Sequence, residues 1–145
     1  MSHKTSLSTS LFSTSAAALL ALASLGTAAP AHAGDVSNVQ LSCYVDTNAW
    51  DYASIDECVS YWTPWTASNP SQAVFEVVGL AAGSYTFYWT DLTTGQVGVC
   101  ATGDSACLRS IRVGRSKTMR VTVIDNQSGA SKTVVATAYF EDGWN

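Results

Sequence analysis

Histidine is almost missing from this 145-residue sequence, because the only two, His3 and His32, lie within the first 33 residues. Serine and cysteine nucleophiles in Ser-His-Asp or Cys-His arrangements need an imidazole as their base. The C-x2-C spacing of structural zinc modules is missing as well. We therefore expect no catalytic residue, no metal and no cofactor, and we predict that the protein is not an enzyme.

Charge is also scarce. Charged residues make up 12% of the chain, with 7 basic against 11 acidic side chains and a formal net charge of -4. Proteins that bind nucleic acid gather Lys and Arg against the phosphate backbone, so this balance argues against a nucleic-acid partner. No apolar run reaches the roughly 18 to 20 residues of a membrane span, and we expect no span in the mature protein.

The first 33 residues have the pattern of a secretory signal peptide. Lys4 supplies a positive charge, residues 16–25 form a short apolar core, and Ala31-His32-Ala33 matches the A-x-A cleavage pattern. We predict cleavage before Gly34. Residues 34–145 would then be a single domain of a bacterial protein that is secreted to the periplasm or to the cell exterior.

Four cysteines remain after that cleavage, and an even number in an exported chain predicts two disulfides. Their spacing favours Cys43–Cys58 and Cys100–Cys107, because each pair brackets a short polar segment. A long-range pairing that ties two sheets together is the alternative. Closing the first loop would stabilise the fold by roughly 3 kcal/mol in the chain-entropy model.

The remaining pattern predicts strands throughout residues 34–145. β-branched and aromatic residues alternate with polar ones, and turn residues punctuate the runs at close intervals, as in β-sandwiches and barrels. A short helix fits only residues 52–56, and hairpin turns are predicted at 93–95 and 125–129. The expected strands are 39–45, 57–62, 72–80, 84–90, 96–100, 108–113, 118–124 and 133–140.

Two phrases of the sequence are similar to those of known sandwich domains. Residues 79–91 read G-L-A-A-G-S-Y-T-F-Y-W-T-D and residues 121–129 read V-T-V-I-D-N-Q-S-G. They resemble the immunoglobulin-like and PKD-like domains of bacterial exported proteins. The resemblance implies an all-β, immunoglobulin-like antiparallel β-sandwich of about eight strands, with Tyr85, Phe87 and Trp89 in its core. Such domains commonly serve as spacers, adhesion modules or accessory domains of secreted hydrolases.

Ionisable side chains offer few rival chemistries. A glycosidase needs two carboxylates that face one cleft, and nothing in the sequence brings Asp51, Glu57 and Glu76 together. Lys117 and Lys132 lie next to predicted turns, where we expect them to be solvated. Five oxygen-bearing residues that could attract calcium are interpreted as turn residues that bind their own backbone. They are Asp104, Asp125, Asn126, Glu141 and Asp142.

Aromatic residues gather in the one irregular region, residues 46–71. Exposed rings stack on sugars or anchor protein partners, so this cluster is our candidate binding site. The alternative is that the rings pack under a loop held by the first disulfide. The candidate residues are Trp50, Tyr52, Tyr61, Trp62 and Trp65. They predict a secreted, non-catalytic binding or structural module that recognises a protein or polysaccharide partner.

Basic residues are clustered too, at positions 109, 112, 115, 117 and 120. They form either a patch for an anionic partner or the charged protection of an edge strand. We expect Arg112 and Arg120 on the solvent faces of neighbouring strands. Arg109, just beyond the loop between Cys100 and Cys107, suggests a different function: a secreted inhibitor or regulator of an extracellular hydrolase.

Overall fold

The computed structural model describes residues 34–47, 51–65 and 67–143, so the predicted signal peptide lies outside the described residues. The described residues form nine β-strands and no helix. The strands are β1 (Gln40–Asp46), β2 (Ser54–Ile55), β3 (Glu57–Trp62), β4 (Ser71–Val78), β5 (Tyr85–Asp91), β6 (Gln96–Val97), β7 (Ala106–Ile111), β8 (Arg115–Asp125) and β9 (Ser131–Asp142).

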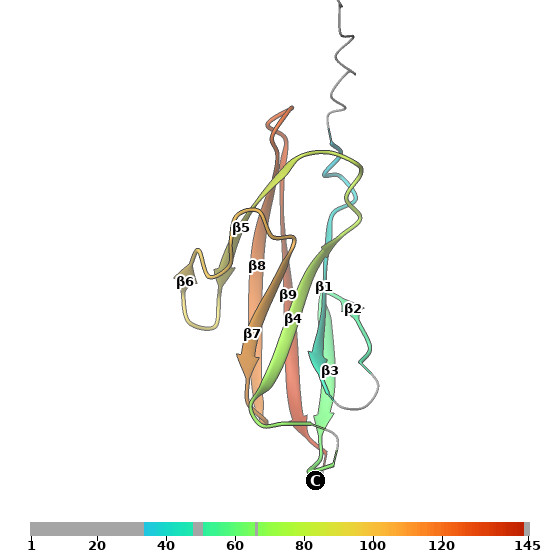
Figure 1. Ribbon diagram of the computed structural model, residues 1–145, viewed down its shortest axis with the longest axis vertical. Coiled ribbons are helices and arrows are strands. Elements are labelled where there is room, and N and C mark those ends of the chain that lie inside the picture. The colour runs from blue at the N-terminus through green and yellow to red at the C-terminus, as the bar shows by residue number, and fades with distance from the viewer. Residues whose placement is uncertain (1–33, 48–50, 66, 144–145) are drawn as a thin grey trace, which may run out of the picture.

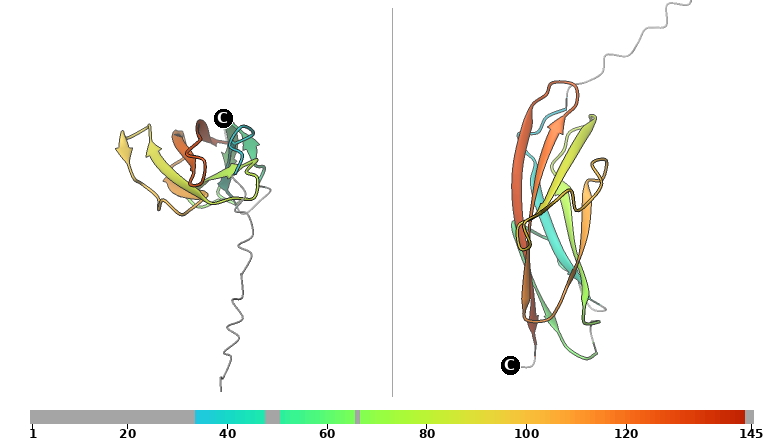
Figure 2. Two further views of the ribbon diagram at one scale, coloured as in Figure 1. Left: turned by 90° about the horizontal axis from the view of Figure 1, so that it is seen from above. Right: turned by 90° about the vertical axis from the view of Figure 1, so that its left-hand side faces the viewer.

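The strands make two sheets that lie face to face (Figure 1). The four-stranded sheet has the order β2-β1-β4-β7 and the five-stranded sheet the order β3-β9-β8-β5-β6. Figure 2 shows the two layers from above and from the side, with the long strands running along the length of the molecule. The predicted all-β sandwich is confirmed, with nine strands in place of eight.

Two details of the prediction are wrong. β3 runs parallel to β9, with Glu57 opposite Thr137, so the sandwich is not wholly antiparallel. The short helix expected at residues 52–56 is replaced by β2, because this segment pairs along the edge of β1. Asp56 then joins both sheets: its N–H donates to Leu41 O at 2.9 Å, and its carbonyl accepts from Thr137 N at 2.8 Å.

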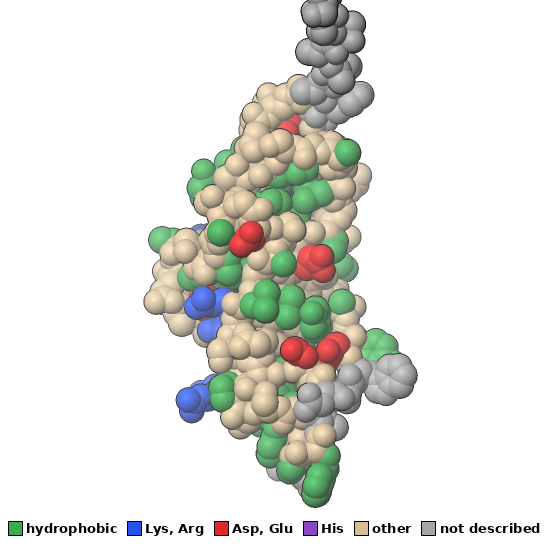
Figure 3. All heavy atoms as spheres, in the orientation of Figure 1, with side chains coloured by type: hydrophobic (Ala, Val, Ile, Leu, Met, Phe, Trp, Pro, Cys, Tyr) green, Lys and Arg blue, Asp and Glu red, His purple; other side chains and the backbone are tan. Residues whose placement is uncertain are grey.

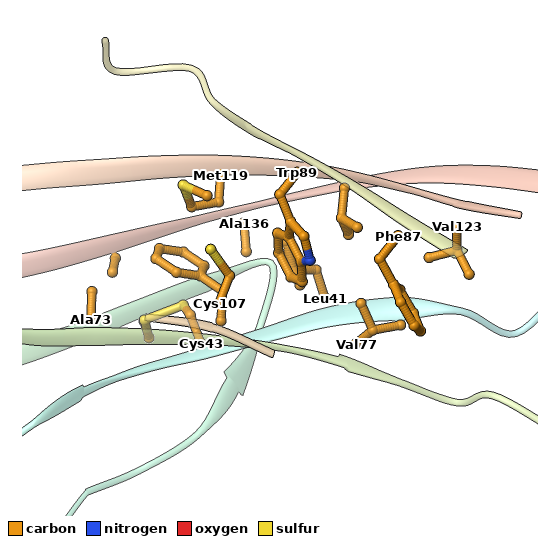
Figure 4. Close-up of a cluster of buried hydrophobic side chains, with 14 of the residues drawn as sticks. Leu41, Cys43, Ala73, Val77, Phe87, Trp89, Cys107, Met119, Val123 and Ala136 are labelled. Atoms are coloured by element: carbon orange, nitrogen blue, oxygen red, sulfur yellow. A yellow bond between two sulfur atoms is a disulfide. The ribbon is translucent and has the colours of Figure 1, made fainter. Parts of the chain in front are cut away.

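The core lies between the sheets and follows the predicted alternation. In β5, Phe87 and Trp89 are buried and Tyr85 is half-buried against the core, whereas Tyr88 is exposed on the opposite face. Figure 4 shows the Trp89 side chain reaching from the five-stranded sheet toward Leu41 of β1. The indole Nε1 donates to Asp104 O at 2.9 Å, so the one polar atom of this buried ring is satisfied.

The tight turn between β4 and β5 requires glycine in the sequence that precedes Tyr85. Gly79 has a φ of +77°, and a Cβ added there would lie 2.2 Å from the carbonyl oxygen of Asn38, so only glycine fits. The Tyr85 hydroxyl donates to Ala81 O at 2.9 Å, so this side chain fastens the turn. Both predicted hairpins are confirmed, with Gly95 and Gly129 at positive φ.

Both predicted disulfides are present, Cys43–Cys58 and Cys100–Cys107. The first joins β1 of one sheet to β3 of the other. The second lies on the opposite side, where the chain leaves β6 and crosses to β7; the strand predicted at 96–100 therefore ends at Val97. The predicted pairing of cysteines close in sequence thus links the two sheets. The sequence suggests such a link only for a pairing of cysteines far apart in sequence.

Removing each disulfide should destabilise the fold according to the length of the loop that it closes. The Cys43→Ala/Cys58→Ala variant opens a loop with a sequence separation of 15, and the Cys100→Ala/Cys107→Ala variant one of 7. Chain entropy predicts losses of about 3 and about 2 kcal/mol in the free energy of unfolding. Urea denaturation would measure both, and a larger loss in the second variant would contradict the entropic account.

Candidate functional site

Three of the predicted aromatic side chains are exposed to solvent. Trp65 is 82% exposed, Tyr52 75% and Tyr61 63%. Tyr61 points outward from β3, Trp65 belongs to the turn that follows it, and Tyr52 lies in the separate connection between β1 and β2. Trp50 lies outside the described residues, so its prediction stays untested.

Trp62 is placed differently from the other candidates, and its role as a contact residue stays a prediction. It is half-buried and packs against the core, on the same side of β3 as Cys58. The indole Nε1 donates to Ala67 O at 3.0 Å. Trp62 therefore supports the turn from beneath, as the alternative interpretation of the aromatic cluster expected.

The turn that carries Trp65 is held at several points. The hydrogen bond from Trp62 to Ala67 spans it, and Gly143 N donates to Trp62 O at 2.9 Å. Further along, Val113 N donates to the Asn69 side chain at 3.3 Å. The backbone on either side of Trp65 is therefore anchored by hydrogen bonds to the rest of the fold.

We call Tyr61 and Trp65 the aromatic surface. Val59, two positions before Tyr61, is also exposed and faces the same way, and Glu141 lies opposite Tyr61 in the parallel pair β3–β9. Hydrophobic side chains gather at the lower tip of the molecule in Figure 3, where β3 ends in Figure 1. Exposed rings beside a carboxylate can stack on a sugar or fill a pocket of a protein.

A charged cluster that the sequence did not reveal lies inside the sandwich. The Asp91 carboxylate is fully buried and contacts Lys117 Nζ at 3.0 Å and Arg109 at 3.5 Å. It also accepts the N–H groups of Thr93 and Thr94. Burial raises the pKa of Asp91, but the hydrogen bond and charge of Lys117, with the two N–H groups, hold it below its usual value.

This cluster corrects one prediction about the basic residues. Lys117, expected to be solvated, points into the sandwich, and its side chain is only 13% exposed. Arg109 points inward from β7 toward the same carboxylate. Arg120 is exposed on β8 as predicted, whereas Arg112 is exposed but lies in the turn after β7, not on a strand. Lys132 donates to Ser37 O at 2.6 Å. The sequence alone could not show that Arg109 and Lys117 point inward, because it does not reveal that Asp91 is buried between the sheets.

The inhibitor hypothesis loses the feature that suggested it. Arg109 lies on a strand with its guanidinium at Asp91, so it is not displayed to a protease. The loop between Cys100 and Cys107 is itself fastened at three points. Its carbonyl oxygens accept from Phe87 N, Val77 N and the Trp89 indole.

The carboxylates do not assemble into a hydrolytic or metal site within the described residues. Glu57 and Glu76 lie exposed on strands of different sheets, and Asp51 accepts a hydrogen bond from Thr47 N. Asp125 is buried in its turn, where hydrogen bonds from Ser128 and Gln127 lower its pKa. No group of three His, Cys, Asp or Glu side chains that could hold a metal occurs in this part of the chain.

Two concave sites lie away from the aromatic surface, and the sequence predicted neither cavity, although it offered the basic residues of the second as a patch for an anionic partner. One, of about 330 Å³, is bounded by Tyr88, Val97 and Arg120 on the β5–β6 side. The other, of about 280 Å³, lies beside the β7–β8 turn and contains Arg112, Arg115 and Lys117. The clustering of basic residues was the only sequence signal for the second pocket, because its other walls come from distant segments.

Among the described residues there is no helix long and apolar enough to cross a membrane. The chain matches no protein-family model, no curated protein and no solved structure.

Proposed function

We propose that the protein is a secreted, non-catalytic module that binds a protein or carbohydrate partner through its aromatic surface. The observation that carries this proposal is Trp65, a large apolar ring that is 82% exposed on a braced turn. Burying such a ring in a complex gains free energy in proportion to the apolar area removed from water. Export is supported by the signal-like first 33 residues and by the two disulfides.

Truncation of the exposed rings tests the proposal. Binding of the purified protein to arrays of polysaccharides and of extracellular proteins identifies the class of partner. Trp65→Ala and Tyr61→Ala should then each weaken binding by about thirtyfold, the effect of losing a hot-spot aromatic. Neither change should alter the fold, because both side chains are exposed.

Tyr88→Ala is the matched control, since Tyr88 is an exposed ring on β5 outside the aromatic surface. It should leave the affinity within about twofold, as expected for a residue outside the contact. If Tyr88→Ala abolishes binding while Trp65→Ala does not, the site is the concave surface beside β6 and the proposal fails.

A further inference from the structure

We propose that the pocket beside the β7–β8 turn binds a tetrahedral oxyanion, sulfate or phosphate, either free or carried as an ester. This proposal is independent of the proposed function, because no residue of the aromatic surface lines the pocket. Its walls come from the turn after β5, the end of β7 and the start of β8. The fold therefore assembles the site from three segments.

Every ionisable side chain in the wall is a cation: Arg112, Arg115 and Lys117. The guanidinium groups of Arg112 and Arg115 form no ion pair with any residue that the structure describes. Figure 3 shows basic side chains in separate groups along the side of the molecule on which β7 lies in Figure 1. A concave surface with charge of one sign concentrates anions.

The buried cluster behind the pocket does not neutralise this charge. Lys117 shares the single carboxylate of Asp91 with Arg109, so two cations face one anion there. The Arg109 Nε is buried and has no acceptor among the described residues. Buried donors are almost always satisfied in proteins. The described residues around Lys117 thus provide two cations and one carboxylate, so the charge that borders the pocket stays positive.

Hydroxyl groups complete the lining. Thr93 Oγ1 accepts the Thr118 N–H at 2.8 Å, which leaves the Thr93 hydroxyl proton for donation to a ligand. Ser110 and Ser116 add two further hydroxyls. Guanidinium groups and hydroxyls from three segments line the pocket, and such donors fit the oxygens of a tetrahedral anion better than a planar carboxylate with a single charge.

The size of the pocket limits its ligand. About 280 Å³ lies just under the lower end of the range of small-molecule sites, about 300 Å³. The space accommodates one oxyanion, or that group with the sugar ring that carries it. The exposed positions of Arg112 and Arg115 leave the pocket open to a group on a longer polymer.

Titration of the disulfide-bonded protein at fixed ionic strength tests the site. Sodium sulfate and sodium phosphate should shift the amide NMR signals of Thr93, Ser110 and Ser116, and sodium acetate should shift them much less. Arg112→Gln and Arg115→Gln should each weaken sulfate binding by about tenfold or more, the loss expected for a hydrogen bond to a charged group. Dextran sulfate, compared with uncharged dextran, tests the esterified source.

Arg120→Gln is the matched control, because it removes the same charge from an exposed position on β8 outside this pocket. Its sulfate affinity should stay within about twofold of the unmodified protein, since exposed charges act weakly across screened distances. Tighter binding of dextran sulfate than of sulfate would identify the ester as the source, and equal or weaker binding the free ion. No response at the three amides, or an equal loss in Arg120→Gln, would overturn the proposal.

Discussion

Replacing Asp91 with alanine should lower the free energy of unfolding by about 3–5 kcal/mol, as expected when one partner of a buried ion cluster is removed. The side chains of Lys117 and Arg109 would then face each other without the carboxylate between them, and Thr93 and Thr94 would lose its hydrogen bonds. Chemical denaturation followed by circular dichroism measures the loss.

Two further variants serve as comparisons for Asp91→Ala. Lys117→Met should cost less than Asp91→Ala, because Arg109 remains beside the carboxylate. Asp104→Ala removes a carboxylate from an exposed turn and should change stability by no more than about 0.5 kcal/mol. Equal losses for Asp91→Ala and Asp104→Ala would show that the buried cluster contributes nothing special.

The same cluster should make the fold sensitive to acid. The pKa of Asp91 is lower in the folded protein than the value of about 3.9 in an unfolded chain. Between the two values the unfolded state binds more protons, so the stabilisation is complete above about pH 5 and is lost as pH falls through the folded pKa. Asp91→Asn should therefore flatten the fall in stability between about pH 5 and pH 2. Part of the fall in stability should remain in the Asp91→Asn variant, because the pKa of Asp125 is also lowered, chiefly by its hydrogen bond with the Ser128 side chain.

Replacing Trp89 with alanine should be comparably damaging, with a loss of about 3–5 kcal/mol in the free energy of unfolding. The indole is 1% exposed and fills the space between the sheets, so alanine would leave a cavity and strip Asp104 O of its donor. Trp89→Phe should cost less, because it keeps most of the ring volume but not the hydrogen bond.

Trp65→Ala provides the comparison for this prediction within the same protein. It removes the same side chain from an exposed turn and should change stability by no more than about 0.5 kcal/mol. If the two tryptophan variants were equally stable, the assignment of Trp89 to the core and of Trp65 to the surface would be untenable.

Local patterns of the sequence predicted most of the fold. The alternation of Tyr85, Phe87 and Trp89 identified the inner face of β5, and short spacing identified both disulfides. The parallel pairing of β3 with β9 could not be predicted in this way. The two strands lie far apart in the sequence, and the residues of neither strand indicate which strand it pairs with. The small β2 was missed because two residues carry no periodicity.

The candidate site was predicted less completely, and for identifiable reasons. Tyr61 and Trp62 are neighbours, so on a strand only one of them can face solvent. Cys58, committed to a disulfide, marks the inward side of β3, and Trp62 lies four positions later on that side. This signal could have separated the two rings. For the pocket beside the β7–β8 turn, the clustered basic residues were the only signal. Its shape could not be predicted, because Thr93 and Lys117 are distant in the sequence and line the same pocket only in the folded chain.

The position of β9 has a consequence for how the sandwich forms. β9 is the last strand of the sandwich, yet it lies between β3 and β8 in the five-stranded sheet. Until its residues are present, β3 has no sheet neighbour, and that layer exists only as β8-β5-β6. Long-range pairing of this kind makes folding slow. The five-stranded sheet can therefore be completed only after β9 has become available, which places its assembly late in folding.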